Sequence, residues 1–251
     1  MDLAGAVALV TGGNGGLGQR ICHALAKEGV QIAVMYAQSR DQAEGVAREL
    51  ASRHQVNAAA FACDITDPVA VERVIGDVTG RFGRLDILVN DAAYNIAIPF
   101  TDLDSLTMEV WDKIIAINLT GPFLCTKHAA RWMKGQGSGK IINIASVYGL
   151  IAPSKGLQVA YTASKHGVIG LTRVNAVELM PLGIQVNAIA PGYFFTEMTD
   201  DLRGTTLEES ITRRTPSGRL GETSQLIGTC IYLASAASDH VSGICIPVDG
   251  G

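Results

Sequence analysis

Strict alternation of short apolar runs with longer amphipathic segments constrains the fold of this chain more than any other feature. The apolar runs have the length and unbroken hydrophobicity of strands buried on both faces. They are Val7–Val10, Gln31–Met35, Ala58–Ala62, Leu85–Val89, Lys140–Ala145, Ile184–Ile189 and Ile244–Val248. The amphipathic segments are Leu17–Glu28, Arg40–Arg53, Pro68–Arg81, Leu106–Lys134, Gln158–Met180 and Ser224–Ala234. This order predicts an α/β fold in which one doubly wound parallel sheet of about seven strands carries helices on both faces.

The chain is long enough, and apolar enough, to form one domain around a large core. It has 251 residues, of which 47% are hydrophobic and only 18% are charged, and no Pro/Gly/Ser linker divides it. We therefore expect residues 1–251 to form a single domain. Residues 194–221 are the exception, because they contain no long apolar run and are long for a connection. We expect this stretch to be a lid or a pair of short surface helices.

Charge and cysteine usage exclude several classes of protein. A formal net charge of −4 without any Lys/Arg cluster argues against nucleic-acid binding. No uncharged apolar stretch approaches the roughly 20 residues that a membrane span needs, and the N-terminus lacks the basic region of a signal peptide. The five cysteines show no paired spacing, which is typical of a reducing compartment. We expect a soluble, cytoplasmic protein.

A glycine-rich segment, residues 11–18, directly follows the first predicted strand and opens the first predicted helix. Its sequence is Thr-Gly-Gly-Asn-Gly-Gly-Leu-Gly. Glycines at such a point let the backbone turn sharply and approach a pyrophosphate held at the helix N-terminus. Any tight strand-to-helix connection can use glycines, but the position after the first strand favours nucleotide binding. The segment therefore predicts a sheet of the Rossmann type.

Tyr161 and Lys165 lie one helical turn apart, so both project from the same face of the predicted helix. A phenol has a reference pKa of about 10, and a nearby ammonium would bring that pKa down toward the range useful for acid–base catalysis. Ser146 lies fifteen residues before Tyr161, after a predicted strand, and could hydrogen-bond a substrate oxygen as charge develops on it. The alternative is that Tyr161 and Lys165 are an incidental surface pair.

Taken together, these motifs resemble the short-chain dehydrogenase/reductase family. The glycine spacing is not the Gly-x-Gly-x-x-Gly fingerprint but matches the family's own, and the ordered resemblance runs from about residue 7 to residue 251. It rests on Gly12-x-x-x-Gly16-x-Gly18, Asn90-Asp91-Ala92-Ala93, Asn118, Ser146, Tyr161-x-x-x-Lys165 and Pro191-Gly192. Each motif alone is modest support, and the ordered set is strong.

The resemblance implies hydride transfer between a nicotinamide cofactor and a carbonyl or secondary alcohol, with no metal. The implied catalytic residues are Asn118, Ser146, Tyr161 and Lys165; Lys165 would also hold the cofactor ribose, and Asn118 would help to organise a water relay. The implied cofactor-binding residues are Gly12, Asn14, Gly16, Leu17, Gly18, Tyr36, Gln38, Ser39, Arg40, Asp64, Ile65, Asn90, Ala92, Tyr161, Lys165, Pro191, Gly192 and Thr196.

Asp91 is the main departure from the family pattern, which usually has a second asparagine there. The substitution adds a negative charge near the expected cofactor site. That charge could weaken cofactor binding or pair with a neighbouring cation.

The choice between NADP and NAD is predicted from the end of the second strand, where NAD-dependent enzymes place a carboxylate on the ribose hydroxyls. That position is Tyr36, and no Asp or Glu occurs between it and Asp41. Gln38, Ser39 and Arg40 offer donors for a 2′-phosphate, so we favour NADP(H) over NAD(H). The alternative is that Arg40 only begins the next helix and faces water.

The substrate is less constrained. The C-terminal third resembles sugar-acid members of the family such as gluconate 5-dehydrogenases, whereas the whole chain equally resembles the 3-oxoacyl-[acyl-carrier-protein] reductase branch. Residues expected to face the substrate are Tyr148, Ile151, Ala152, Tyr193 and the 194–221 segment, a mixed polar and apolar set. Our hypothesis is a sugar-acid or polyol substrate. The alternatives are an acyl-carrier-protein reductase and a nucleotide-sensing protein without catalysis, which would not need all four catalytic residues.

The two longest predicted helices are apolar over much of their circumference. Besides residues that a sheet would cover, they carry Trp111, Ile114, Phe123, Val168 and Leu171. The excess over one buried face predicts a subunit interface. Similar family members associate through these helices, so we expect a homo-oligomer, specifically a tetramer.

Overall fold

All seven strands lie in one parallel sheet. The structure, a computed structural model, describes residues 2–96, 98, 102, 104–152, 158–195 and 203–251. The strands are β1 Val7–Thr11, β2 Gln31–Tyr36, β3 Ala58–Ala62, β4 Ile87–Asn90, β5 Gly139–Ile144, β6 Ile184–Pro191 and β7 Cys245–Val248. Their order is β3-β2-β1-β4-β5-β6-β7, with every neighbouring pair parallel. The order changes direction between β1 and β4, which confirms the predicted doubly wound sheet.

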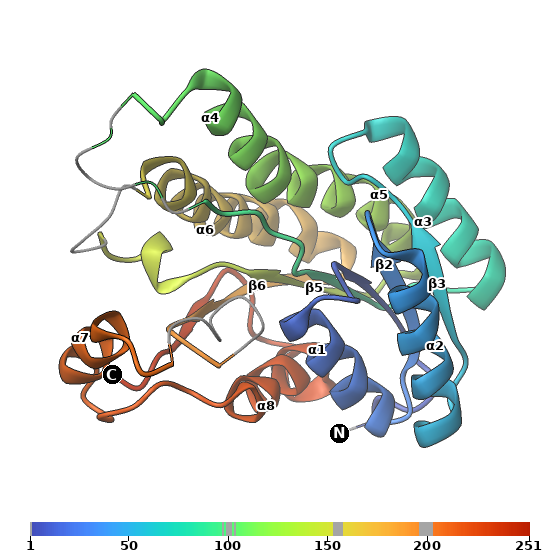
Figure 1. The fold of residues 1–251 in the computed structure, drawn as a ribbon. Coiled ribbons are helices and arrows are strands. Elements are labelled where there is room, and N and C mark those ends of the chain that lie inside the picture. Colours follow the sequence, from blue (N-terminus) through green and yellow to red (C-terminus); the bar gives the residue numbers. More distant parts are fainter. Residues whose placement is uncertain (1, 97, 99–101, 103, 153–157, 196–202) are drawn as a thin grey trace.

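Helices cover both faces of the sheet (Figure 1). They are α1 Gly16–Lys27, α2 Arg40–His54, α3 Pro68–Phe82, α4 Met108–Ile115, α5 Gly121–Gln136, α6 Val159–Leu179, α7 Thr206–Arg214 and α8 Thr223–Ala234. Residues of α1, α2 and α8 pack on one face, and residues of α3, α5 and α6 pack on the other. Because adjacent strand residues point to opposite faces, Val10 of β1 belongs to the first core and Leu9 to the second. Burial on both faces explains why the strands are unbroken apolar runs.

The helix predicted over residues 106–134 is interrupted. Helix α4 ends at Ile115, a π-helical turn covers Ala116–Thr120, and α5 begins at Gly121. Pro122 lies in the first turn of α5. It has no N–H to donate to the carbonyl of Asn118, so a regular α-helix cannot continue through this point. The wide turn lets the helical path continue with different hydrogen bonding.

The start of α3 shows how the sequence sets an element boundary. Pro68 occupies the first helical position, where its missing N–H costs nothing. The Asp67 carboxylate accepts hydrogen bonds from the backbone N–H groups of Val69 and Ala70, at 2.9 and 3.3 Å. Two of the helix's otherwise unpaired donors are thereby satisfied. The Asp-Pro pair therefore fixes the start of this helix.

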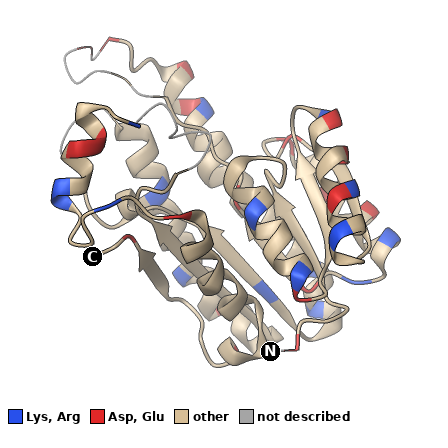
Figure 2. Ribbon diagram, turned by 60° about the horizontal axis from the view of Figure 1, so that its bottom comes forward, with Lys and Arg blue, Asp and Glu red and all other residues tan. Residues whose placement is uncertain are grey.

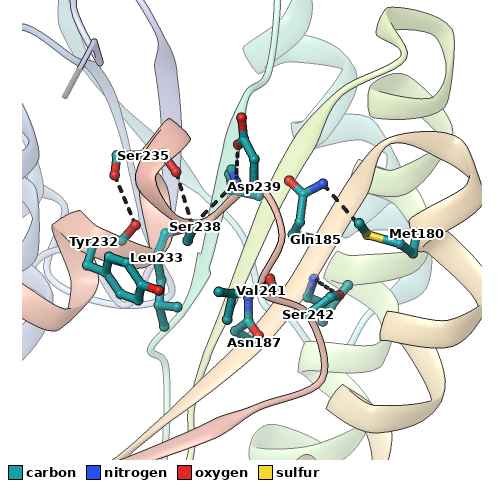
Figure 3. A network of polar contacts seen from close by, with 12 residues as sticks. Met180, Gln185, Asn187, Tyr232, Leu233, Ser235, Ser238, Asp239, Val241 and Ser242 are labelled. Atoms are coloured by element: carbon teal, nitrogen blue, oxygen red, sulfur yellow. Dashed lines mark hydrogen bonds and ion pairs between the residues drawn. The ribbon is translucent and has the colours of Figure 1, made fainter.

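Polar side chains in the amino-terminal halves of β5 and β6 anchor the connection between α8 and β7 (Figure 3). Asn187 of β6 donates to the carbonyl of Val241 at 2.8 Å and accepts from the N–H of Ile244 at 3.2 Å. Lys140 of β5 donates to the Asp239 carboxylate at 2.7 Å. Asn187 is buried. Its two side-chain hydrogen bonds hold backbone groups of the connection just before β7. We call this group of contacts the amino-end network.

The outer surface carries charges of both signs. Figure 2 shows Lys and Arg interspersed with Asp and Glu along the helices rather than gathered into one basic stripe in that view. In the part of the chain that the structure describes, no helix has the length and apolar character needed to cross a bilayer.

Candidate active site

Two positions of the glycine turn between β1 and α1, Gly12 and Gly18, leave little or no room for a side chain. Gly12 has φ +64°, and a Cβ there would lie 3.0 Å from the Ala92 Cα. A Cβ on Gly18 would collide with the Gly12 carbonyl oxygen and lie 2.9 Å from the Asp91 Oδ2. Gly18 is buried, and Gly16 starts α1 beside it. The turn therefore packs directly onto the segment that follows β4.

The N-terminus of α1 is suited to hold an anion. Its cap is Gly15, no side chain caps it, and its first turn contains no acidic residue. The first N–H groups of the helix thus have no side-chain partner. They and the helix dipole favour a negatively charged group such as the pyrophosphate of a dinucleotide. Leu17 packs partly buried against the core beneath this turn. The uncapped N-terminus of α1 and the glycines before it fit the pyrophosphate of the cofactor.

The segment after β2 lies against the same turn. The Asn14 side-chain amide donates to the carbonyl oxygen of Gln38 at 3.0 Å. Ser39 adopts a left-handed conformation with φ +62°, which a non-glycine residue rarely does, and it turns the chain into α2. The structure therefore brings Asn14 and Gln38 together, and Ser39 follows directly in the chain.

Tyr36 and Arg40, on either side of this segment, differ in burial. Tyr36 is buried, and its side chain belongs to the core cluster shared by α1, α2 and α8. Arg40 is the first residue of α2, is exposed, and its Nε donates to the Glu44 Oε1 at 2.7 Å. Arg40 therefore both begins the helix, as one alternative proposed, and stands beside the segment that would meet a 2′-phosphate.

The remaining residues expected at the cofactor follow β3 and β6. Asp64 is exposed, and its Oδ1 accepts from the N–H and hydroxyl of Thr66, at 2.9 and 2.7 Å. Ile65 is buried against Gly121, where a Cβ would lie 2.5 Å from its Cδ1. Pro191 ends β6, and a Cβ on Gly192 would lie 2.8 Å from the Asp249 Cα. Thr196 lies outside the described residues.

Asn90, by contrast, directs its side chain into the protein. Its Nδ2 donates to the Asn143 Oδ1 at 2.8 Å and to the Thr126 Oγ1 at 3.3 Å, and Asn143 donates to the Thr172 Oγ1 at 2.9 Å. These buried groups connect β4 and β5 with α5 and α6. Sequence reasoning missed Asn143, Thr126 and Thr172. The asparagine within the apolar run 140–145 was the available indication.

Ser146, Tyr161 and Lys165 meet at the carboxyl end of β5. Lys165 is buried, and its Nζ donates to the carbonyl of Ile144, the last residue of β5, at 2.7 Å. The same Nζ lies 5.6 Å from the centroid of the Tyr161 ring. The side chains of Tyr161 and Ser146 share a hydrogen bond. The three predicted catalytic residues therefore form one group, which is not an incidental surface pair.

The electrostatics of this group differ from the expectation. Burial raises the pKa of Tyr161, and the hydrogen bond from Ser146 only partly opposes that rise. Burial lowers the pKa of Lys165 to about 8, against the opposing effect of Asp91. The prediction that the Lys165 ammonium brings the phenol pKa down is wrong for this structure, because desolvation is the larger effect.

Asp91 lies between the glycine turn and Lys165. Its carboxylate contacts the Gly18 position, and it interacts electrostatically with Lys165. Burial raises the pKa of Asp91 to about 7, while Lys165 pulls it back. The electrostatic interaction with Lys165 is in line with the alternative of a neighbouring cation, but burial has the larger effect on the pKa of Asp91.

Asn118 lies in the π-helical turn and is buried. Its Oδ1 accepts from the N–H of Tyr94 at 2.7 Å, and its Nδ2 donates to the carbonyl of Tyr94 at 2.9 Å and to the Ser164 Oγ at 3.2 Å. Ser164 in turn donates to the backbone carbonyl of Tyr161 at 2.7 Å. Asn118 therefore joins the segment after β4 to the helix that carries the catalytic pair. Nothing in the sequence indicated Tyr94.

Two of the residues expected to face the substrate, Tyr148 and Tyr193, lie beside this group. The hydroxyls of Tyr148 and Tyr193 are 2.6 Å apart, and Ile151 and Ala152 are exposed. At the two ends of the 194–221 segment, Phe194 and Gly221 form an isolated β-bridge. Helix α7 lies between them in the chain. Residues 196–202 of the expected lid lie outside the described residues.

Comparison with known proteins identifies the family. A family model described as enoyl-(acyl carrier protein) reductase matches residues 12–251. A 3-oxoacyl-[acyl-carrier-protein] reductase, FabG, from Staphylococcus aureus is 39% identical over 248 residues, 97% of this chain and 96% of the relative. The chain belongs to the short-chain dehydrogenase/reductase family. It is accordingly an oxidoreductase of a family that binds a nicotinamide cofactor.

Solved structures of the family share the fold throughout. A gluconate 5-dehydrogenase from Burkholderia cenocepacia in complex with NADP and tartrate is 35% identical, with a TM-score of 0.92, covering 99% of this chain and 95% of that one. An NAD+-bound xylitol dehydrogenase is 30% identical, with a TM-score of 0.92, covering 100% of both chains. These short-chain dehydrogenases differ in substrate and cofactor. Their similarity to this chain therefore does not identify its substrate or its cofactor.

Proposed function

We propose that this short-chain dehydrogenase/reductase transfers a hydride between a nicotinamide cofactor and the carbonyl or secondary alcohol of a sugar-acid or polyol substrate. The observation that carries the proposal is the convergence of Ser146, Tyr161 and Lys165 at the carboxyl end of β5, beside the glycine turn. In doubly wound sheets, ligands bind at that edge, where the strand order reverses.

Each side chain has a distinct task. The nicotinamide ring, when bound, supplies or accepts the hydride. The hydroxyls of Ser146 and Tyr161 both donate to the substrate oxygen, and Tyr161 exchanges the proton with it. Because burial keeps the pKa of Tyr161 above its ordinary value, the phenol is protonated at neutral pH and ready to act as an acid in the reducing direction. Lys165 places a positive charge next to the phenolate that forms.

Asn118 is proposed to complete the catalytic set. Its side chain is fully engaged with Tyr94 and Ser164, so it acts by holding α6 and the segment after β4 in register beside Tyr161. We propose a water relay alongside it for proton exchange with solvent. Residues 1–251 act as one domain in this scheme, and the 194–221 segment covers the substrate.

NADP(H) is the proposed cofactor. Its pyrophosphate would lie at the N-terminus of α1, and its 2′-phosphate would meet Gln38, Ser39 and Arg40, which have no carboxylate in the position that NAD-dependent enzymes use. The NADP complex of the gluconate 5-dehydrogenase supports this choice. NAD(H) is the alternative, supported by the NAD+-bound xylitol dehydrogenase.

The substrate proposal rests on gluconate and xylitol dehydrogenases among the structural neighbours and on the hydroxyl-bearing residues around the catalytic group. The second candidate is reduction of a 3-oxoacyl thioester, supported by the 39% identity to FabG. We do not retain the non-catalytic sensor, because the family and the assembled catalytic group both indicate an enzyme.

A substrate panel tests the proposal. Purified protein is assayed with NADPH and NADH against keto sugar acids, ketoses and acetoacetyl thioesters, and with NADP+ and NAD+ against sugar acids and polyols, scored by cofactor absorbance. We expect the highest kcat/KM with a sugar acid or polyol and with the phosphorylated cofactor. Higher kcat/KM with the thioester would establish the second candidate instead.

We propose further that the protein works as a homotetramer in the cytoplasm. Phe123 and Trp132 of α5 and Val174 and Val177 of α6 are between 46% and 77% exposed. Phe123 also lines a groove of about 320 Å³ between the two helices, together with Ala130 and Leu179. Such an apolar surface is typical of an interface. Of the residues first expected there, Ile114 and Val168 are buried in the subunit instead. A stable 26.4 kDa monomer in light scattering would contradict the tetramer.

A further inference from the structure

Two phenol hydroxyls meet beside the catalytic group. Tyr148 lies in a 3-10 turn, Val147–Gly149, that follows β5, and Tyr193 lies in the segment that follows β6. Their hydroxyl oxygens are 2.6 Å apart, and the rings meet edge to face, with an interplanar angle of 85° and centroids 6.1 Å apart. β5 and β6 are parallel neighbours, so the pair lies at the same edge of the sheet as Ser146. We call it the tyrosine pair.

The tyrosine pair has a fixed position relative to the reacting groups. The backbone N–H of Tyr148 donates to the Ser146 Oγ at 3.1 Å. The next residue, Gly149, packs so closely on α6 that a Cβ would lie 2.7 Å from the Lys165 carbonyl oxygen. The turn that carries Tyr148 is therefore held by the serine on one side and by the helix of Tyr161 on the other.

The reacting carbonyl does not need the tyrosine pair. A carbonyl oxygen has two lone pairs, and in the proposed function Ser146 and Tyr161 use both. Within the pair one hydroxyl donates to the other, so the accepting hydroxyl keeps its own proton for an outside acceptor. Among the described residues, neither hydroxyl has a second hydrogen-bond partner, and both residues are partly exposed. The pair is therefore ready to bind a polar group from solution.

Tyr193 remains protonated under ordinary conditions. Burial, followed by its hydrogen bond with Tyr148, raises the pKa of Tyr193, and Arg214 opposes that rise only in part. A phenol held in this way is a hydrogen-bond donor throughout the neutral pH range. The pair can thus donate to an alcohol or carboxylate oxygen and accept from an alcohol proton.

We infer that the tyrosine pair binds a second substrate oxygen, on a carbon next to the one that exchanges the hydride, and so selects hydroxy ketones and vicinal diols over simple ketones and alcohols. The inference rests on the proposed function and deepens it. A site built to hydrogen-bond a hydroxyl discriminates strongly against an analogue that lacks it, because the site's polar groups are then left unpaired. Tyr148 and Tyr193 are therefore specificity-determining residues.

Two ketones that differ by one hydroxyl test the inference. We measure kcat/KM for 1-hydroxybutan-2-one and butan-2-one in the wild type and in Tyr148→Phe and Tyr193→Phe. Each variant should lose about tenfold in kcat/KM for the hydroxy ketone, the size expected for one hydrogen bond to a substrate, and should keep its kcat/KM for butan-2-one. The matched control is Tyr232→Phe, which removes a phenol hydroxyl from α8, near the amino-end network (Figure 3), and should change neither value.

Two results would overturn the inference. Equal losses for both ketones would mean that the pair only ties two segments together. Wild-type kinetics in both variants would mean that the hydroxyls do not touch the substrate. Thermal unfolding of both variants identifies a folding defect, and because phenylalanine keeps the ring, we expect an unchanged Tm.

A binding measurement separates this inference from the proposed function. Calorimetric titration of the NADP-loaded protein with D-gluconate, and with hexanoate as the acid of equal length without hydroxyls, requires no turnover. The wild type should bind gluconate more tightly, and Tyr193→Phe should lose about tenfold for gluconate alone. If the wild type reduces no ketone at all, the proposed function fails, while this titration still decides whether the pair binds hydroxyls. Equal binding of both acids in all variants would overturn the inference.

Discussion

The two edges of the sheet use polar side chains in opposite ways. At the amino-end network, Asn187 and Lys140 each meet a partner within hydrogen-bond distance, and the result is a fixed connection between α8 and β7. At the carboxyl edge, Asp91, Tyr161 and Lys165 are packed together with shifted pKa values. Shifted pKa values cluster at functional sites because chemistry needs groups held away from their preferred state. We therefore expect one edge to contribute to stability and the other to reactivity.

Removing the phenol hydroxyl of Tyr161 should show this contrast most strongly. Tyr161→Phe should lower kcat by about 100-fold or more, the usual cost of losing a general acid, with an unchanged Tm. The measurements are initial rates with saturating cofactor and a thermal melt. The control is Tyr232→Phe on α8, which should be fully active. An active Tyr161→Phe enzyme would remove the acid–base assignment.

The amino-end network should respond in stability instead. Asn187→Ala leaves the N–H of Ile244 and the carbonyl of Val241 without the partner that they have in the wild type. It should lower the free energy of unfolding by about 2 kcal/mol, or about 1 kcal/mol for each hydrogen bond. Denaturant titration measures it, and kcat should stay within twofold or so. Gln185→Ala is the matched control on the same strand, because Gln185 loses only a 3.8 Å contact with the Met180 sulfur. An equal loss in both variants would show that the asparagine's hydrogen bonds contribute nothing specific.

Substituting Arg40 tests whether the segment after β2 takes part in cofactor binding at the carboxyl edge of the sheet. Arg40→Ala should raise the Kd for NADPH about tenfold, the effect of losing one charge-assisted hydrogen bond, and should leave NADH binding unchanged. Arg48→Ala is the control, since Arg48 also pairs with Glu44, at 3.7 Å, but lies about two turns beyond Arg40 along α2. Equal weakening of both cofactors in the Arg40 variant would assign that residue to the fold alone.

Asp91 should give the smallest effect and the clearest pH dependence. Its folded-state pKa of about 7 is above its ordinary value, so the native state binds the proton more tightly than the unfolded state does. Wild-type stability should therefore fall as pH rises from about 4 to 7. Because the residue is partly exposed, we expect a change of about 1 kcal/mol, or a few degrees in Tm. In Asp91→Asn this slope should be absent, and an unchanged slope would show that the carboxyl is solvated.

The sequence was sufficient for the sheet, the glycine turn and the grouping of Ser146, Tyr161 and Lys165, because each depends on local spacing and on strand ends that a parallel sheet brings together. It could not show which way Asn90 or Tyr36 points. Strands buried on both faces have no polar alternation to mark one side. The sequence also contained no indication that the pKa of Tyr161 is raised. The burial of its side chain depends on segments that are far away in the chain.

The π-helical turn at Ala116–Thr120 has a consequence for the evolution of this sequence. A wide turn shifts the angular phase of the residues beyond it, so the outer face of α4 does not continue as the outer face of α5. The apolar residues that α5 presents to the groove beside α6 are thereby independent of Lys113, which α4 places over the ring of Tyr94. Substitutions on the outer face of α5 can therefore accumulate without rotating Asn118, which lies within the turn. The proposed subunit interface and the geometry of the candidate active site can therefore evolve separately, whereas a single straight helix would have coupled them.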